Sequence, residues 1–146
     1  MQALGFYITY AFIWTFTLLP FFIYYGVSDI LFLVLFYITG YRKEVVTKNL
    51  RNSFPEKGEE ELKRIRRRFY RHFCDVMLES IKTMHMSNKT NARRFKFRNP
   101  ELFDELYEKK KNVIRVSGHY GNWEWMVRFP LLLKHANFYL YHPLKN

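Results

Sequence analysis

The first 40 residues contain a single charged side chain, Asp29, and this feature constrains the fold more than any other. Within them, residues 3–25 carry no charge at all, and about 20 such residues are enough for a helix to cross the hydrocarbon core of a bilayer. A cleaved signal peptide is disfavoured, because Met1 and Gln2 supply no positive charge ahead of the apolar run. The sequence therefore predicts a transmembrane or deeply embedded helix over residues 3–25.

A second apolar stretch, residues 30–38, follows the interruption at Gly26, Ser28 and Asp29. It is too short to span a bilayer by itself, so we expect an interfacial or re-entrant segment. Several bases follow directly, and the positive-inside rule then places the remainder of the chain in the cytoplasm. We therefore expect residues 1–41 to form a membrane-anchoring segment, with a second region at 42–146. The alternative interpretation is a buried core helix of a soluble protein.

The charge of the chain is strongly positive and unevenly distributed. The net charge is +11, and all 24 Lys and Arg residues lie after residue 40. An aromatic content of 20% excludes a disordered basic tail. The single cysteine, Cys74, excludes an internal disulfide and a cysteine-built metal site. The histidines show no metal-ligand spacing, so we expect no metal and no cofactor.

Residues 59–86 show the spacing of one amphipathic helix with a basic outer surface. Three glutamates occupy its first turn, where negative charge complements the helix dipole. The bases that follow are Lys63, Arg64, Arg66, Arg67, Arg68 and Arg71. They are consistent with a solvated face, with attraction to anionic lipid at roughly 1 kcal/mol per base, or with docking of an acidic protein. No nucleic-acid recognition motif accompanies them, so we expect no nucleic-acid partner.

After residue 90 the pattern changes to short alternating units. The expected elements are a strand at 94–98, a helix from Asn99 and Pro100 to about 111, a strand at 113–117, a turn at 118–122, a helix at 123–134 and a strand at 138–141. Strands that alternate with helices are typical of an α/β layer with parallel pairing. We therefore predict an α/β fold: a membrane helix, then a basic amphipathic helix, then the first part of a mixed or parallel β-sheet.

The candidate site lies at the turn after the strand at 113–117. In such sheets the active-site residues lie at the carboxyl ends of the strands. His119 follows the carboxyl end of the strand expected at 113–117. A turn lets Glu124 fold back toward the imidazole, where a carboxylate fixes the tautomer and leaves the other ring nitrogen free to accept a proton. Gly121 permits a sharp turn and close approach of a substrate. Asn122 either contacts the substrate or caps the next helix.

No protein nucleophile accompanies this pair. Ser117 lies on the expected strand and lacks the glycine-flanked elbow that exposes a nucleophilic serine. The natural inference is a base that activates a hydroxyl group of the substrate itself.

The segment GHYGNWEW, residues 118–125, closely resembles the His-x4-Asp/Glu block of the bacterial lipid A late acyltransferases, the lauroyl and myristoyl transferases of the lysophospholipid acyltransferase superfamily. Residues 28–57, 67–80 and 141–146 also resemble segments of the same family, and they occur in the same order along the chain. The resemblance covers nearly the whole chain and implies an acyltransferase.

The resemblance implies roles for particular residues and partners. His119 would deprotonate an acceptor hydroxyl on a lipid A precursor, and Glu124 would orient and charge-stabilise His119. The acyl donor would be acyl-acyl carrier protein, which is strongly acidic, so Arg66, Arg67 and Arg68 would dock the donor or seat the anionic acceptor. The implied location is the bacterial inner membrane, with the catalytic part on its cytoplasmic face.

The sequence also departs from the family. Its members continue well beyond residue 146 with a further arginine-bearing motif, and position 142 is His where Arg or Lys is more usual. We therefore take 42–146 as the N-terminal part of a catalytic domain and expect this piece alone to be inactive. The alternatives are transfer to another lipid acceptor, such as an aminolipid or a lysophospholipid, and an inactive membrane-bound fragment that binds acyl carrier protein or anionic lipid.

Overall fold

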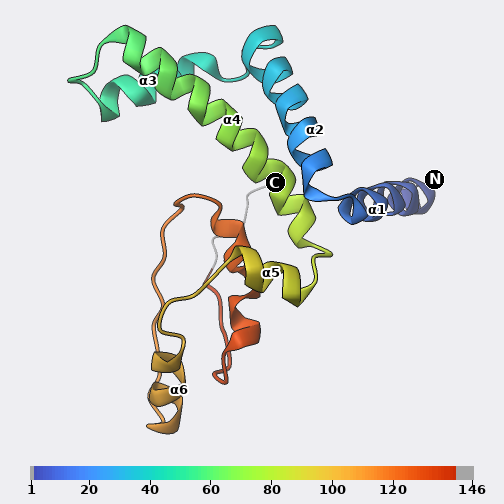
Figure 1. The fold of residues 1–146 in the computed structure, drawn as a ribbon, viewed down its shortest axis with the longest axis vertical. Coiled ribbons are helices and arrows are strands. Elements are labelled where there is room, and N and C mark those ends of the chain that lie inside the picture. Colours follow the sequence, from blue (N-terminus) through green and yellow to red (C-terminus); the bar gives the residue numbers. More distant parts are fainter. Residues whose placement is uncertain (1, 141–146) are drawn as a thin grey trace. The chain divides into compact units, whose positions relative to one another are not determined.

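The computed structural model describes residues 2–140 and divides between Met86 and Ser87 into two compact units (Figure 1). The first unit contains α1 (Gln2–Leu18), α2 (Phe21–Leu33), the π-helical η1 (Val34–Ile38), α3 (Lys43–Ser53) and α4 (Glu59–Thr83). The second contains α5 (Asn88–Arg94), α6 (Glu101–Glu108) and the 3-10 helix η2 (Trp123–Leu132).

The apolar start of the chain folds as two helices that meet at Pro20. Proline lacks the N–H of a helical residue and its ring clashes with the preceding turn, so α1 ends at Leu18 and α2 begins at Phe21. The expected single helix over residues 3–25 is therefore interrupted. Residues 30–38 are not a separate segment either, because they continue α2 into η1. Within the described part, Phe21–Ile38 is the helix that is long and apolar enough to cross a membrane.

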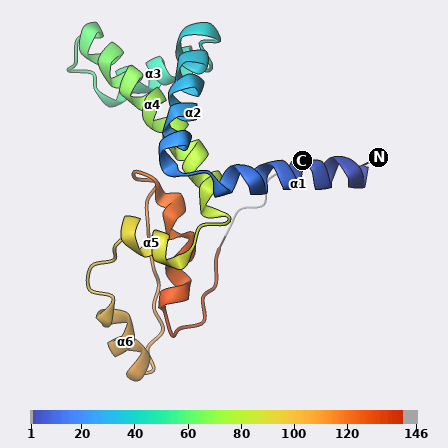
Figure 2. The ribbon, with the colours of Figure 1, turned by 45° about the vertical axis from the view of Figure 1, so that its right-hand side comes forward.

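The long helix α4 organises the first unit, and the amphipathic helix expected over 59–86 is confirmed to Thr83. It lies beside α2 and contacts α3, while α1 leads away from the α2–α4 pair (Figure 2). Phe32, Tyr70 and Cys74 form the buried core. The Tyr70 ring packs edge-on against Phe36 at 5.4 Å between centroids, and its hydroxyl donates to the carbonyl of Tyr41.

The second unit is built around one aromatic ring. Phe129 of η2 is 2% exposed, and its ring centroid lies 4.1 Å from that of Phe97 and 5.2 Å from that of Phe103 in α6. The Ser87 hydroxyl accepts from the Thr90 N–H at 3.2 Å and so caps α5.

The expected α/β fold is wrong for residues 2–140, because none of them forms a β-strand. A β-branched run becomes a strand only when a neighbour pairs with its backbone. The segments at 113–117 and 138–140 have no ladder between them, and Ile114 and Val116 are 91% and 89% exposed. Residue 94 ends α5 instead of opening a strand, and the next two aromatic residues pack in series, Phe95 on Phe97 and Phe97 on Phe129.

The helix expected at 123–134 is also of a different kind. It is the 3-10 helix η2, which contains Pro130, and a proline inside an α-helix removes a hydrogen bond. The last predicted strand reaches position 141, and the family-like block 141–146 with His142 lies outside the described residues.

Candidate active site

The turn that carries the candidate base is shaped by a glycine. Gly121 has a φ of +58°, in the left-handed region where a Cβ is strained. A Cβ built there meets no atom within 4 Å, so the requirement for glycine comes from the backbone angle rather than from crowding. One step earlier, the Tyr120 N–H donates to the Gly118 carbonyl at 2.9 Å and closes the tight turn.

His119 is exposed on this turn and rests against the start of η2. Its ring lies edge-on to Trp123, with 4.5 Å between centroids and an interplanar angle of 68°. This contact fixes one side of the imidazole and leaves the rest of the ring accessible to a substrate. A general base has to be reachable in this way.

Glu124 is half-buried in the first turn of η2 and lines a cleft. Asn122, which immediately precedes η2, makes no side-chain capping bond to it, so the expected capping role is wrong. Across the described ranges, no hydrogen bond or ion pair joins His119 to Glu124. The fold therefore brings the two residues to one turn without pairing them. Catalytic hydrogen bonds are often long or misaligned before substrate binds.

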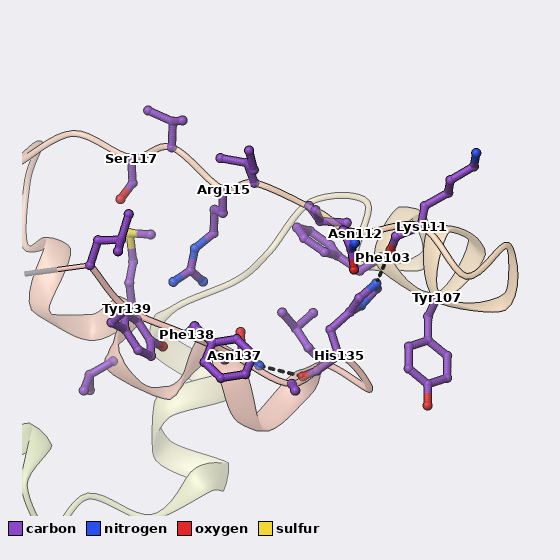
Figure 3. Close-up of a pocket in the computed structure, with 18 of the residues that line it drawn as sticks. Phe103, Tyr107, Lys111, Asn112, Arg115, Ser117, His135, Asn137, Phe138 and Tyr139 are labelled. Carbon is purple, nitrogen blue, oxygen red and sulfur yellow. Dashed lines mark hydrogen bonds between the residues drawn. The ribbon is translucent and has the colours of Figure 1, made fainter.

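A cleft of about 1510 Å³ runs beside this turn, between the segment at 110–117 and the segment at 133–140 (Figure 3). The two segments are tied where His135 Nε2 and the Lys111 carbonyl lie 3.2 Å apart. The ammonium of Lys134 donates to Glu108 and pairs with Asp104, and these contacts, that with Glu108 first, raise the pKa of Lys134. The lining is mostly apolar, which suits a hydrocarbon chain.

Arg115 brings a positive charge into this cleft, and the sequence reasoning did not select it. Its side chain extends into the space between the two segments (Figure 3). The guanidinium carbon stands 4.5 Å from the Phe129 ring centroid and 6.0 Å from that of Tyr139. The available signal is a single base within a β-branched run, a pattern that predicts a strand and gives no role to the base.

The three arginines predicted to dock a partner differ from one another. Arg66 is half-buried and its Nη1 donates to the Thr47 hydroxyl at 2.7 Å, which ties α4 to α3. Arg67 and Arg68 are exposed. All three belong to the first unit, whereas His119 and Glu124 belong to the second. Among residues 2–140, no group of three or more His, Cys, Asp or Glu side chains is arranged to hold a metal ion.

Comparison with the models of known protein families gives the decisive observation. The model described as bacterial lipid A biosynthesis acyltransferase matches residues 1–146. The chain belongs to this family. It is therefore an acyltransferase of the lipid A type, with lipid substrates and acyl donors, and its family is associated with bacterial membranes. No curated protein and no solved structure matched the chain.

Proposed function

We propose that the protein moves a fatty acyl group from acyl-acyl carrier protein to a hydroxyl of a lipid A precursor, at the cytoplasmic face of the inner membrane. His119 is the general base. The observation that carries the proposal is the exposed imidazole on the turn at Gly121 in a member of this family, followed by Glu124 in the lining of an apolar cleft.

The reaction follows from the groups present. A ring nitrogen of His119 takes the proton of the acceptor hydroxyl, and the oxygen attacks the thioester carbonyl. A C–O bond forms, the C–S bond breaks, and the proton passes from the imidazolium to the departing thiolate. Glu124 acts through His119, since a carboxylate on the second ring nitrogen stabilises the imidazolium. Gly121 allows the substrate to approach the backbone beside His119 closely, and Asn122 contacts the substrate.

The acyl donor docks through the basic outer face of α4. Arg67 and Arg68 are exposed there, and attraction between them and an acidic carrier protein raises the rate of encounter. Arg66 adds its positive charge to this face, and its hydrogen bond to Thr47 holds its side chain in place. On this proposal, residues 1–41 hold the enzyme at the membrane, and 42–146 contribute the N-terminal part of the catalytic domain.

The test measures acyl transfer by the product of the intact gene in isolated membranes. Labelled acyl-acyl carrier protein is supplied with a lipid A precursor or, separately, with a lysophospholipid. Wild type should acylate the lipid A precursor, and His119→Ala should lower the rate by roughly 10²–10⁴-fold, because the proton is no longer removed. The matched control is His72→Ala, which removes an exposed imidazole from α4 and should leave the rate unchanged.

Two results would overturn parts of this proposal. Wild-type rates in His119→Ala would remove His119 from the mechanism. Transfer to the lysophospholipid in place of the lipid A precursor would replace the proposed acceptor while leaving the acyltransferase chemistry intact.

A further inference from the structure

The two apolar helices at the start of the chain differ in what covers them. In α1, the consecutive residues Phe6, Tyr7 and Ile8 are 64%, 66% and 62% exposed. Consecutive residues of a helix point about 100° apart, so these three present apolar surface in three directions. A helix that is apolar all round requires an apolar environment all round.

One face of α2, in contrast, is polar and bonded to α4. The Tyr25 hydroxyl donates to Glu79 at 2.7 Å, and the Ser28 hydroxyl donates to Asp75 at 2.5 Å. The third link is an ion pair at 2.8 Å between Asp29 and an arginine of α4, Arg71.

The exposed side of α2 and η1, which faces away from the buried Tyr24, Ser28 and Phe32, carries an apolar stripe. Its large apolar members are Phe22, Ile30, Leu33 and Tyr37. This helix therefore has one polar, protein-bound face and one apolar, exposed face, which is the pattern of a helix that lies in a membrane surface.

The break between α1 and α2 is held by a buried lysine. Lys82 of α4 is 9% exposed, and its ammonium donates to the carbonyls of Thr17 and Leu19, the latter at 2.6 Å. The same nitrogen lies 5.4 Å and 5.2 Å from the ring centroids of Phe21 and Tyr24. A charged side chain of α4 is thus fixed at the end of α1, where the apolar helix terminates at Pro20.

These contacts conflict with a bilayer crossing by Phe21–Ile38. Asp29 lies at the middle of that 18-residue stretch, so a crossing would place its carboxylate near the bilayer centre. The crossing would also bring Arg71, Asp75 and Glu79 to membrane depth, because they are bonded to α2. Charged side chains are strongly disfavoured there. No such conflict arises for α1, because residues 3–18 carry no charge.

We propose that the boundary of the hydrocarbon core falls at Leu19 and Pro20. The helix α1 inserts into the lipid, and α2 lies along the membrane surface with its apolar stripe against the acyl chains and α4 on the water side. We take a phospholipid bilayer as the occupant of both apolar surfaces for two reasons. The charge-free helix α1 ends next to the charged side chain of Lys82, as expected at a boundary between lipid and water. All Lys and Arg residues follow residue 40, so the apolar surfaces precede the part of the chain that requires water. The inference rests on the membrane location in the proposed function and is independent of His119.

Depth-dependent quenching of a fluorescent label tests this boundary. Phe12→Cys near the middle of α1 and Ile30→Cys near the middle of Phe21–Ile38 are labelled with a small environment-sensitive dye, because both side chains are exposed. The full-length protein is placed in phosphatidylcholine and phosphatidylglycerol vesicles that contain lipids with a quencher either near the headgroup or deep in the acyl chain. The label at 12 should be quenched most by the deep quencher, and the label at 30 most by the shallow one.

Deepest quenching at 30 would overturn the proposal in favour of a crossing by Phe21–Ile38. An unquenched label at 12 would overturn it in favour of water or a second protein chain around α1. Both variants are made with native Cys74, which is 0% exposed, and again with Cys74→Ala, so that a folding defect in one background does not remove the test. Adding His119→Ala should leave the depths unchanged, which separates failure of this inference from failure of the catalytic assignment.

Discussion

A few side chains set the chemistry and the packing of this protein. Gly121 adopts the left-handed backbone conformation of the turn on which His119 is exposed. The His119 ring packs edge-on against Trp123. Arg115 brings a positive charge into the neighbouring apolar cleft. Such a charge can stabilise the oxyanion that forms when a thioester is attacked. In the first unit, Cys74 sits at the centre of the core.

Glu124→Gln tests the role of the carboxylate that we place behind His119. The amide keeps the size of the side chain but no longer stabilises an imidazolium, so kcat should fall by roughly 10²–10⁴-fold with little change in KM. Steady-state kinetics on membranes from cells that carry the intact gene measure the two constants separately. Glu124→Asp should recover part of kcat. A Glu124→Gln enzyme with wild-type kcat would contradict the assignment, and Glu105→Gln on the exposed side of α6 serves as the control.

The buried thiol of Cys74 makes the stability of the first unit depend on pH. Burial, and secondarily the charge of Asp75, raises the pKa of Cys74. The unfolded chain then loses this proton at lower pH than the folded one, so the free energy of unfolding should decrease as pH rises above about 8.5. Urea unfolding in detergent between pH 8 and pH 9.5, below the tyrosine pKa of about 10, measures the effect. The decrease should be smaller in Cys74→Ala, and an equal decrease in both proteins would contradict this account.

At the scale of elements, the long amphipathic helix α4 was predictable from the sequence, whereas the absence of strands from the described residues was not. The amphipathic pattern of 59–86 is local, because its apolar stripe and its acidic first turn both lie within one segment, and α4 follows it closely. A strand depends on a neighbour that the local pattern does not contain, and the segment at 113–117 has no such neighbour among the described residues. The break at Pro20 could be predicted from the proline itself. The hydrogen bonds from Lys82 to the backbone at this break could not, because they join residues that are far apart in the sequence.

Lys82→Met tests the contact that joins α4 to the α1–α2 break. Methionine retains most of the apolar stem but leaves the carbonyls of Thr17 and Leu19 without this donor. The free energy of unfolding should fall by about 1–3 kcal/mol, the range for buried groups that lose a hydrogen bond. Denaturation in detergent, followed by circular dichroism, measures the change. Lys89→Met, at an exposed position of α5, is the control, and equal stability of the two variants would rule out this role for Lys82.

The exposed bases of α4 provide a separate test of donor docking. Arg67→Glu with Arg68→Glu should weaken binding of acyl carrier protein by about tenfold at low salt, mainly through a slower association rate. The difference from wild type should shrink at high salt, because salt screens exposed charges. Surface plasmon resonance at two salt concentrations measures both effects. Lys109→Glu with Lys110→Glu reverses two exposed charges elsewhere, and an equal loss in that protein would mean that net charge, not this face, controls binding.

At the scale of the whole molecule, we propose that charge-free α1, the basic surface of α4 and the His119 turn serve one activity at a membrane. The sequence showed this division directly, because charge is almost absent before residue 40 and abundant after it. The family assignment was also predictable, since the block around His119 and Glu124 resembles the family whose model matches the entire chain. How α2 is bonded to α4 was not predictable, because Asp29, Ser28 and Tyr25 acquire their partners only in the fold.

We propose that this protein acylates a lipid A precursor through His119. The most direct measurement is mass spectrometry of the lipids from cells with and without the intact gene, with rescue by full-length wild type or by its His119→Ala variant. We predict that lipid A loses one acyl chain without the gene, and that wild type restores this chain while the variant does not. Unchanged lipid A, or rescue by the variant, would contradict the account.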